Sequence, residues 1–166
     1  MDNNEGKEII SDTKPINKET LPEVPKNRIL IFGSTQSGIF EMQKDFKEYL
    51  KERGILDPHV ETARYIDSIK PAIFGTHAIP ESEEEKRKNL PKGVIVLPTM
   101  RQETEAGNMT IDTYNATSLY GQTVYDYIKT ICGEYNVPVI FLGEDYSREK
   151  MEKEINKLLK FKKIVG

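Results

Sequence analysis

The 166-residue chain contains no tryptophan, one cysteine (Cys132) and two histidines (His59 and His77). A single cysteine excludes an internal disulfide and a cysteine-based zinc cluster, and two histidines make a histidine-rich metal site equally unexpected. The chain also lacks any apolar run approaching the roughly 20 residues of a membrane span. Residues 1–5 do not resemble the start of a signal peptide. We therefore expect a cytoplasmic protein with no metal centre and no membrane partner.

Neither sign of charge dominates the chain, which has 24 Lys and Arg residues against 27 Asp and Glu residues, a net charge of −3. The basic residues form no stripe of the kind that binds nucleic acid, so we expect no nucleic-acid partner. Residues 1–26 are polar, mixed in charge and interrupted by Pro15, Pro22 and Pro25. This composition predicts a disordered N-terminal tail over 1–26, followed by one domain over 27–166.

Beyond the tail, strand-like runs alternate with helix-like amphipathic segments. The predicted strands cover residues 29–32, 59–66, 71–75, 93–97 and 137–142. Predicted helices are a stripe over 39–50 that ends near Gly54, a short exposed helix over 81–89, a helix over roughly 118–134, and a terminal helix with Ser147 as its N-cap. Residues 98–117 are predicted to form a long polar loop. Such alternation predicts an α/β fold with a doubly wound five-stranded parallel sheet.

One loop stands out because it follows a buried strand and precedes a helix. Gly33-Ser-Thr-Gln-Ser-Gly38 combines hydroxyl groups with backbone N–H groups at a helix N-terminus, an arrangement that holds phosphate in many α/β proteins. Gly33 and Gly38 have the spacing of a Walker A loop, but Ile39 and Phe40 replace its lysine and hydroxyl residue, which argues against a P-loop nucleotidase. The alternative is an ordinary strand-to-helix turn that binds nothing.

Ligands of doubly wound sheets bind outside the carboxyl ends of the strands, near the switch point. Three loops are predicted to converge there: 33–38, 75–80 and 98–121. Their candidate ligand-binding residues are Gly33, Ser34, Thr35, Gln36, Ser37, Gly38, Thr76, His77, Thr99, Met100, Arg101, Gln102, Tyr120 and Gly121. Arg101 is the candidate for an anionic ligand. We assign no catalytic residue, although Glu103, Glu105 and Asp112 could supply an acid/base pair to a small nucleotide-processing enzyme.

The same loop and the C-terminal third of the chain resemble flavodoxin-like proteins, in particular the flavoproteins that partner class Ib ribonucleotide reductase. The similarity rests on the Tyr120-Gly121 pair, the amphipathic helix after it, the Tyr135-Asn-Val-Pro138 sequence before the last strand, residues 92–95, and the 33–38 loop. This resemblance implies a flavodoxin-like fold that binds FMN and passes electrons to a protein partner. Two alternatives remain open: a flavin-free Rossmann-like module that binds a nucleotide or a protein, and the nucleotide-processing enzyme.

Overall fold

The structure, a computed structural model, describes residues 28–55, 57–75, 81–143 and 147–161, and the side chains within them up to Leu158. The predicted tail over 1–26 lies outside the described residues. Helices and parallel strands alternate along the described chain, so the predicted α/β class is confirmed.

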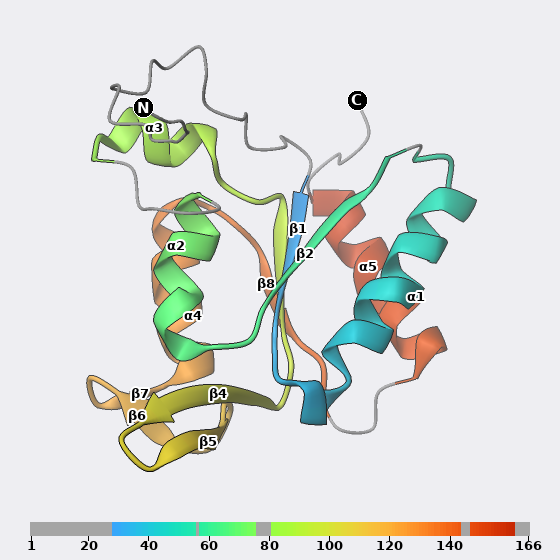
Figure 1. Cartoon of the computed structure of the whole chain (residues 1–166). Helices are drawn as coiled ribbons and strands as arrows, with labels where there is room; N and C mark the ends of the chain where they lie inside the picture. The colour runs from blue at the N-terminus through green and yellow to red at the C-terminus, as the bar shows by residue number, and fades with distance from the viewer. Residues whose placement is uncertain (1–27, 56, 76–80, 144–146, 162–166) are drawn as a thin grey trace, which may run out of the picture.

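The centre of the fold is a parallel sheet with the strand order β2-β1-β3-β8 (Figure 1). Its strands are β1 (Arg28–Phe32), β2 (His59–Ala63), β3 (Gly93–Val96) and β8 (Val139–Phe141). Every residue of β1 and β3 is buried, as expected for central strands that are covered on both faces. From β1, the chain adds β2 on one side and then β3 and β8 on the other. The carboxyl ends of β1 and β3 are therefore the switch point of the sheet.

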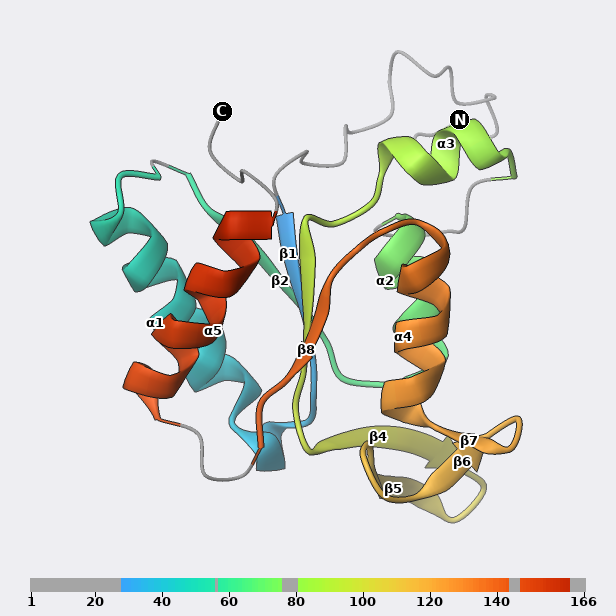
Figure 2. The ribbon, with the colours of Figure 1, turned by 180° about the vertical axis from the view of Figure 1, so that it is seen from behind.

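Two pairs of helices cover the two faces of this sheet (Figures 1 and 2). α1 (Ile39–Glu52) and α5 (Arg148–Phe161) pack on one face, and α2 (Ile69–Phe74) and α4 (Val124–Glu134) pack on the other. A short exposed helix, α3 (Glu83–Lys88), lies near the amino ends of the strands, within the range predicted for it. Alternate β1 residues enter separate cores: Ile29 and Ile31 pack with α1 and α5, while Leu30 and Phe32 pack with α2 and α4.

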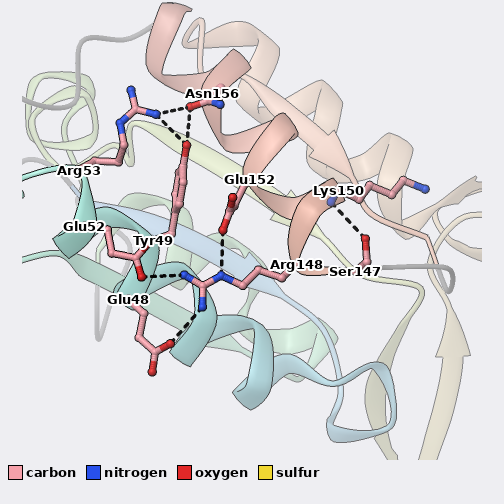
Figure 3. Close-up of polar contacts among 9 residues, drawn as sticks. All are labelled: Glu48, Tyr49, Glu52, Arg53, Ser147, Arg148, Lys150, Glu152 and Asn156. Atoms are coloured by element: carbon pink, nitrogen blue, oxygen red, sulfur yellow. Dashed lines mark hydrogen bonds and ion pairs between the residues drawn. The ribbon is translucent and has the colours of Figure 1, made fainter.

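α1 and α5 are joined by polar side chains above their shared core (Figure 3). Arg148 donates hydrogen bonds from Nε to Glu152 Oε2 (2.8 Å), from Nη2 to Glu52 Oε2 (3.1 Å) and from Nη1 to Glu48 Oε1 (3.3 Å). Tyr49 OH donates to Asn156 Oδ1 across the same interface (2.7 Å). Because such surface ion pairs contribute little stability, the buried apolar faces of the helices hold them together.

Two helix ends predicted from the sequence are confirmed. Gly54 follows the end of α1 with a φ of 94°, a left-handed conformation that favours glycine after a helix. Ser147 caps α5, because its Oγ accepts a hydrogen bond from the backbone N–H of Lys150 (3.2 Å).

The predicted third strand, 71–75, is wrong, because residues 69–74 form α2 and the sheet therefore has four strands among the described residues. A short apolar run cannot by itself distinguish a buried strand from a buried helix turn. Pro71 lies in the first turn of α2, where its missing N–H costs nothing, and Ile69 and Ile73 are buried one turn apart. The second predicted strand is also shorter, and ends at Ala63 instead of residue 66.

The predicted polar loop over 98–117 is wrong as well, because most of it forms an antiparallel hairpin. Its strands are β4 (Thr99–Thr104) and β5 (Gly107–Asp112), and a smaller hairpin follows, made of β6 (Thr117–Leu119) and β7 (Gln122–Thr123). Met100 and Ile111 are paired and buried, which anchors the larger hairpin to the core. The helix predicted over roughly 118–134 consequently begins at Val124, where Thr123 Oγ1 accepts from Asp126 N–H (3.0 Å).

Cys132 is fully buried in α4, and this burial raises the pKa of its thiol to about 12. Since only the thiolate is nucleophilic, we expect native protein at pH 9 to react with iodoacetamide at least about a hundredfold more slowly than urea-unfolded protein. Mass spectrometry of samples quenched over time measures both rates. Equal rates would show that α4 opens readily and that the thiol is not protected.

Candidate functional site

The carboxyl ends of β1, β2 and β3 meet the two hairpins at one end of the sheet (Figure 1). A short 3-10 helix, η2 (Thr35–Ser37), follows β1 there, and β4 begins three residues after β3 ends. The segments 33–38 and 99–102 are thus brought together, as predicted from the sequence. Thr76 and His77, from the other predicted loop, lie outside the described residues. Gly75, just before them, follows α2 and not a strand.

Hydroxyl groups of the 33–38 loop bond to Thr99. Ser34 Oγ lies 2.6 Å and Ser37 Oγ lies 2.5 Å from Thr99 Oγ1, and Ser37 Oγ also accepts a hydrogen bond from Thr99 N–H (2.9 Å). The backbone N–H of Ser34 donates to the carbonyl of Thr99 (2.7 Å), and Ser34 is fully buried. These bonds join the segments that follow β1 and β3. The two serine hydroxyls therefore join η2 to the start of β4 within the protein.

Glycine is favoured at positions 33 and 38 of this loop for two different structural reasons. A Cβ on Gly33 would lie 2.7 Å from Leu97 Cδ1 and 2.8 Å from Leu97 Cβ, so glycine permits the close approach of the segments that follow β1 and β3. Gly38 has a φ of 76° and precedes the first turn of α1, which has no side-chain cap. Glu41 lies in that turn, and its carboxylate complements the positive end of the helix dipole. An added anion at this helix end would lie near a negative charge.

A second group of side chains at the carboxyl ends of the strands is better placed to bind an anion. We call Phe40, Arg64, Tyr65 and Arg101 the arginine–aromatic cluster. Arg64 follows β2, and its Cζ lies 5.6 Å from the centre of the Phe40 ring and 5.5 Å from that of Tyr65. Arg101 N–H donates to the carbonyl of Arg64 (2.8 Å), and Tyr65 and Arg101 form a parallel bridge. Four residues, from α1, from the segment after β2 and from β4, are therefore joined at one place.

One buried nitrogen of the Arg101 side chain, Nε, lacks a hydrogen-bond partner among the described residues. Arg101 pairs with Thr110 in the hairpin, and Thr110 Oγ1 donates to Gln36 Oε1 of η2 (3.1 Å). Paired residues share one face of a hairpin, so the Arg101 side of β4 is the side that meets η2. A buried donor without a partner in such a place is a reason to look for a ligand.

Other predicted site residues have different surroundings. Met100 is fully buried and belongs to the core. Gln102 is half-buried in β4, and Thr35 is exposed on η2. Tyr120 and Gly121 form the β6–β7 turn with φ values of 51° and 81°, and the exposed Tyr120 ring lies 6.0 Å from that of Tyr127. Tyr120 and Gly121 thus contribute to the turn of the smaller hairpin.

The acidic residues considered for an enzyme do not meet as a pair. Glu103 and Glu105 are exposed on the hairpin near its turn, whereas Asp112 lies at the other end of β5. The Asp112 carboxylate accepts backbone N–H bonds from Asn115 (2.7 Å) and Tyr114 (2.8 Å). These bonds lower the pKa of Asp112, the one from Asn115 most strongly, against a smaller opposing effect of desolvation. Asp112 therefore shapes the turn that follows β5.

Three residues of the site were not predicted from the sequence: Phe40, Arg64 and Tyr65. Extending the second strand to residue 66 placed Arg64 and Tyr65 inside it, whereas β2 ends at Ala63 and leaves both at the carboxyl edge. Phe40 was used only as a departure from the Walker A pattern. A shorter second strand would have exposed the Arg-Tyr pair as a candidate, because residues directly after parallel strands line ligand sites.

In the part of the chain that the structure describes, no group of three or more His, Cys, Asp or Glu side chains could hold a metal ion. Within the same residues, no helix has both the length and the apolar character needed to cross a membrane. No protein-family model, curated protein or solved structure matches this chain.

Proposed function

We propose that this protein binds a small phosphate-bearing ligand with a planar ring at the carboxyl edge of its sheet, with FMN the first candidate. The observation that carries the proposal is the arginine–aromatic cluster, where the buried Nε of Arg101 has no partner among the described residues. The Arg64 carbonyl accepts the backbone N–H of Arg101, and Arg64 Cζ lies 5.6 Å and 5.5 Å from the centres of the Phe40 and Tyr65 rings. Guanidinium groups bind phosphate through paired N–H donors, and aromatic rings stack on planar ligands.

The position of the cluster supports this proposal. Ligands of doubly wound sheets bind at the carboxyl ends of the strands, and residues from three elements meet there. The Thr99 hydrogen bonds to Ser34 and Ser37 join the loop to β4. We therefore place the ligand phosphate against Arg64 and Arg101, with the 33–38 loop as the wall of the site.

FMN is the first candidate for two reasons. The sequence resembles flavoproteins over the 33–38 loop and the C-terminal third of the chain. The four parallel strands also occur in the order second, first, third, fourth, which is how the flavodoxin-like order begins. A bound flavin would supply the redox chemistry, and the protein would orient it and present it to a protein redox partner. If nucleotides bind and FMN does not, the flavin-free Rossmann-like alternative applies.

Titration of the purified protein with FMN, ATP, NAD and inorganic phosphate tests this proposal. We expect FMN to bind with a submillimolar Kd, and Arg64→Ala and Arg101→Ala each to weaken binding about tenfold to a hundredfold, because hydrogen bonds to charged groups contribute about 1.5–3 kcal/mol. Isothermal calorimetry measures all four ligands, and flavin fluorescence gives an independent Kd for FMN.

Arg87→Ala is the matched control, because Arg87 also lies over an aromatic ring. Its Cζ is 5.0 Å from the centre of the Tyr135 ring, but Arg87 belongs to α3, which lies near the amino ends of the strands. This variant should bind FMN like the wild type. Equal losses in the Arg64 and Arg87 variants would indicate a general charge effect, and no binding by any of the four ligands would refute the proposal.

A further inference from the structure

β5 has one edge that pairs with no strand among the described residues. The β4–β5 sheet contains these two strands alone, and Arg101 of β4 donates its backbone N–H to Arg64, away from β5. Arg101 and Thr110 are therefore a non-hydrogen-bonded pair, so the N–H and C=O of Thr110 also point away from β4. The two-residue period of a strand extends this outward orientation to Asn108 and Asp112.

Among the described residues, this edge lacks several of the features that usually protect an edge strand from pairing. Residues 107–112 contain no lysine, arginine or proline, and the β4–β5 register runs without a bulge from Thr99 to Thr104. Asn108, Thr110 and Asp112 are exposed, so their outward main-chain groups are accessible. Natural proteins commonly block such edges, and an accessible edge of this length is a template for one more strand.

The charges around the edge indicate what kind of strand fits. Glu103, Glu105, Asp112 and Asp126 are the acidic residues between positions 99 and 128, and Arg101 is the single basic residue there. Glu103 is paired with Asn108 and Arg101 with Thr110, so Glu103 and Asp112 lie on the same face of the hairpin as Arg101, where two acidic side chains face one basic side chain. A second copy of this chain would bring acidic residues next to acidic residues, whereas a basic strand would meet opposite charge.

The other face of the hairpin carries three apolar side chains, Met100, Met109 and Ile111, together with the polar Gln102 and Thr104. Met109 is 50% exposed and lies on the same face as the buried Ile111, two residues along β5. A strand added beside β5 would therefore place every second side chain against acidic residues and the others beside Met109. The two faces together favour a partner sequence in which basic and apolar residues alternate.

We propose that the free edge of β5 binds an extended segment of a partner protein in which Lys or Arg alternates with apolar residues. The segment adds a third strand to the β4–β5 hairpin and pairs its main chain with Asn108, Thr110 and Asp112. Its basic side chains lie on the face of Glu103 and Asp112, and its apolar side chains cover Met109. This site uses the outer edge of β5, whereas the ligand site proposed above uses the cluster beside β4, although both lie on the face of the hairpin that carries Arg101.

A synthetic peptide of alternating lysine and valine, long enough to span β5, is the probe, and amide NMR measures its binding to the full chain. We expect saturable shifts at residues 107–112, and an affinity that falls as salt is added. A glutamate–valine peptide of the same length, and the lysine–valine peptide with a central proline, should each bind at least about tenfold more weakly.

Substitutions at Thr110 separate the main-chain pairing from its side-chain contact. Thr110→Pro removes the outward N–H and should weaken peptide binding at least about tenfold. Thr110→Val keeps that N–H, loses the hydroxyl that bonds Gln36, and should bind the peptide like the wild type. Glu103→Lys leaves the backbone unchanged and should weaken binding through charge alone, which keeps the test valid if Thr110→Pro fails to fold.

Three outcomes would overturn the proposal. They are no peptide binding by the wild type, equal binding of the lysine and glutamate peptides, and a β5 edge already covered by a second copy of the chain, seen as a dimer by sedimentation. FMN titration of Thr110→Pro separates the two proposed sites, because losing the peptide site should leave FMN binding to the arginine–aromatic cluster measurable.

Discussion

Replacing Arg28 with methionine is expected to lower the free energy of unfolding by about 3–5 kcal/mol. The Arg28 side chain is fully buried at the start of β1, and all of its N–H groups donate. Nε and Nη2 bond Asn89 O (3.2 and 2.6 Å), Nη2 bonds Ile73 O (2.7 Å), and Nη1 bonds Ala72 O and Glu61 Oε1 (both 2.9 Å). Methionine would leave three carbonyls and a carboxylate without this partner.

The charge of Arg28 is consistent with this role. Burial lowers the pKa of the guanidinium, and the neighbouring Glu61 carboxylate opposes that shift. The side chain stays protonated because arginine titrates far above neutral pH. It joins β1 to β2, to the last turn of α2, and to the segment after α3. Removing it should therefore destabilise the contacts among β1, β2, α2 and the segment after α3, at the amino ends of the strands.

Urea unfolding followed by circular dichroism measures the effect, with Arg53→Met as the matched control. Arg53 is exposed, and its Nη1 bonds Tyr49 OH and Asn156 Oδ1 (both 2.7 Å), so its loss should cost less than about 1 kcal/mol. Arg28→Lys should fall between, because an ammonium has fewer donors than a guanidinium. A loss in Arg28→Met no larger than in Arg53→Met would contradict this interpretation.

Thr99→Val is expected to cost about 1–3 kcal/mol, although valine has nearly the same shape. Thr99 Oγ1 is the partner of Ser34 Oγ, which is fully buried, and of Ser37 Oγ. Without the hydroxyl, Ser34 keeps a buried polar atom with no partner. The cost should appear as a lower urea midpoint with an unchanged dependence on urea concentration.

A second substitution tests the cause of that loss. Ser34→Ala in the Thr99→Val background should recover part of the stability, because the buried hydroxyl is then absent. Thr104→Val is the control on the same strand, since the exposed Thr104 hydroxyl bonds only the nearby Gly107 carbonyl (2.7 Å), and it should change stability by about 0.5 kcal/mol or less. A double variant less stable than Thr99→Val would show that the serine–threonine bonds are not the cause.

The sequence was sufficient to predict the elements whose signals are local. β1 and β3 are short apolar runs, and α1, α4 and α5 carry apolar stripes at helical spacing, so their existence and order follow from periodicity. The run 71–75 misled because it is too short to show a period. The hairpin was missed because β5 is almost entirely exposed, which leaves Met100 and Ile111 as the main apolar positions in a polar stretch.

The candidate site was predicted only in part. The meeting of the 33–38 loop with Thr99 follows from the parallel sheet, because both lie after adjacent strands. Two features could not be foreseen: the serine hydroxyls bond Thr99, and Arg64 stacks on Phe40. Both are contacts between side chains far apart in the sequence. Arg28 was missed for the same reason, since its partners come from three separate segments.

Amide NMR spectra recorded while FMN is added to the wild-type protein test most directly whether the carboxyl edge of the sheet is a ligand site. We predict saturable shifts for the amides of Gln36, Phe40, Arg64 and Arg101, with those of Arg87 and Tyr135 at the opposite edge unchanged. Shifts confined to the opposite edge, or no shifts at millimolar FMN, would contradict FMN binding at the arginine–aromatic cluster.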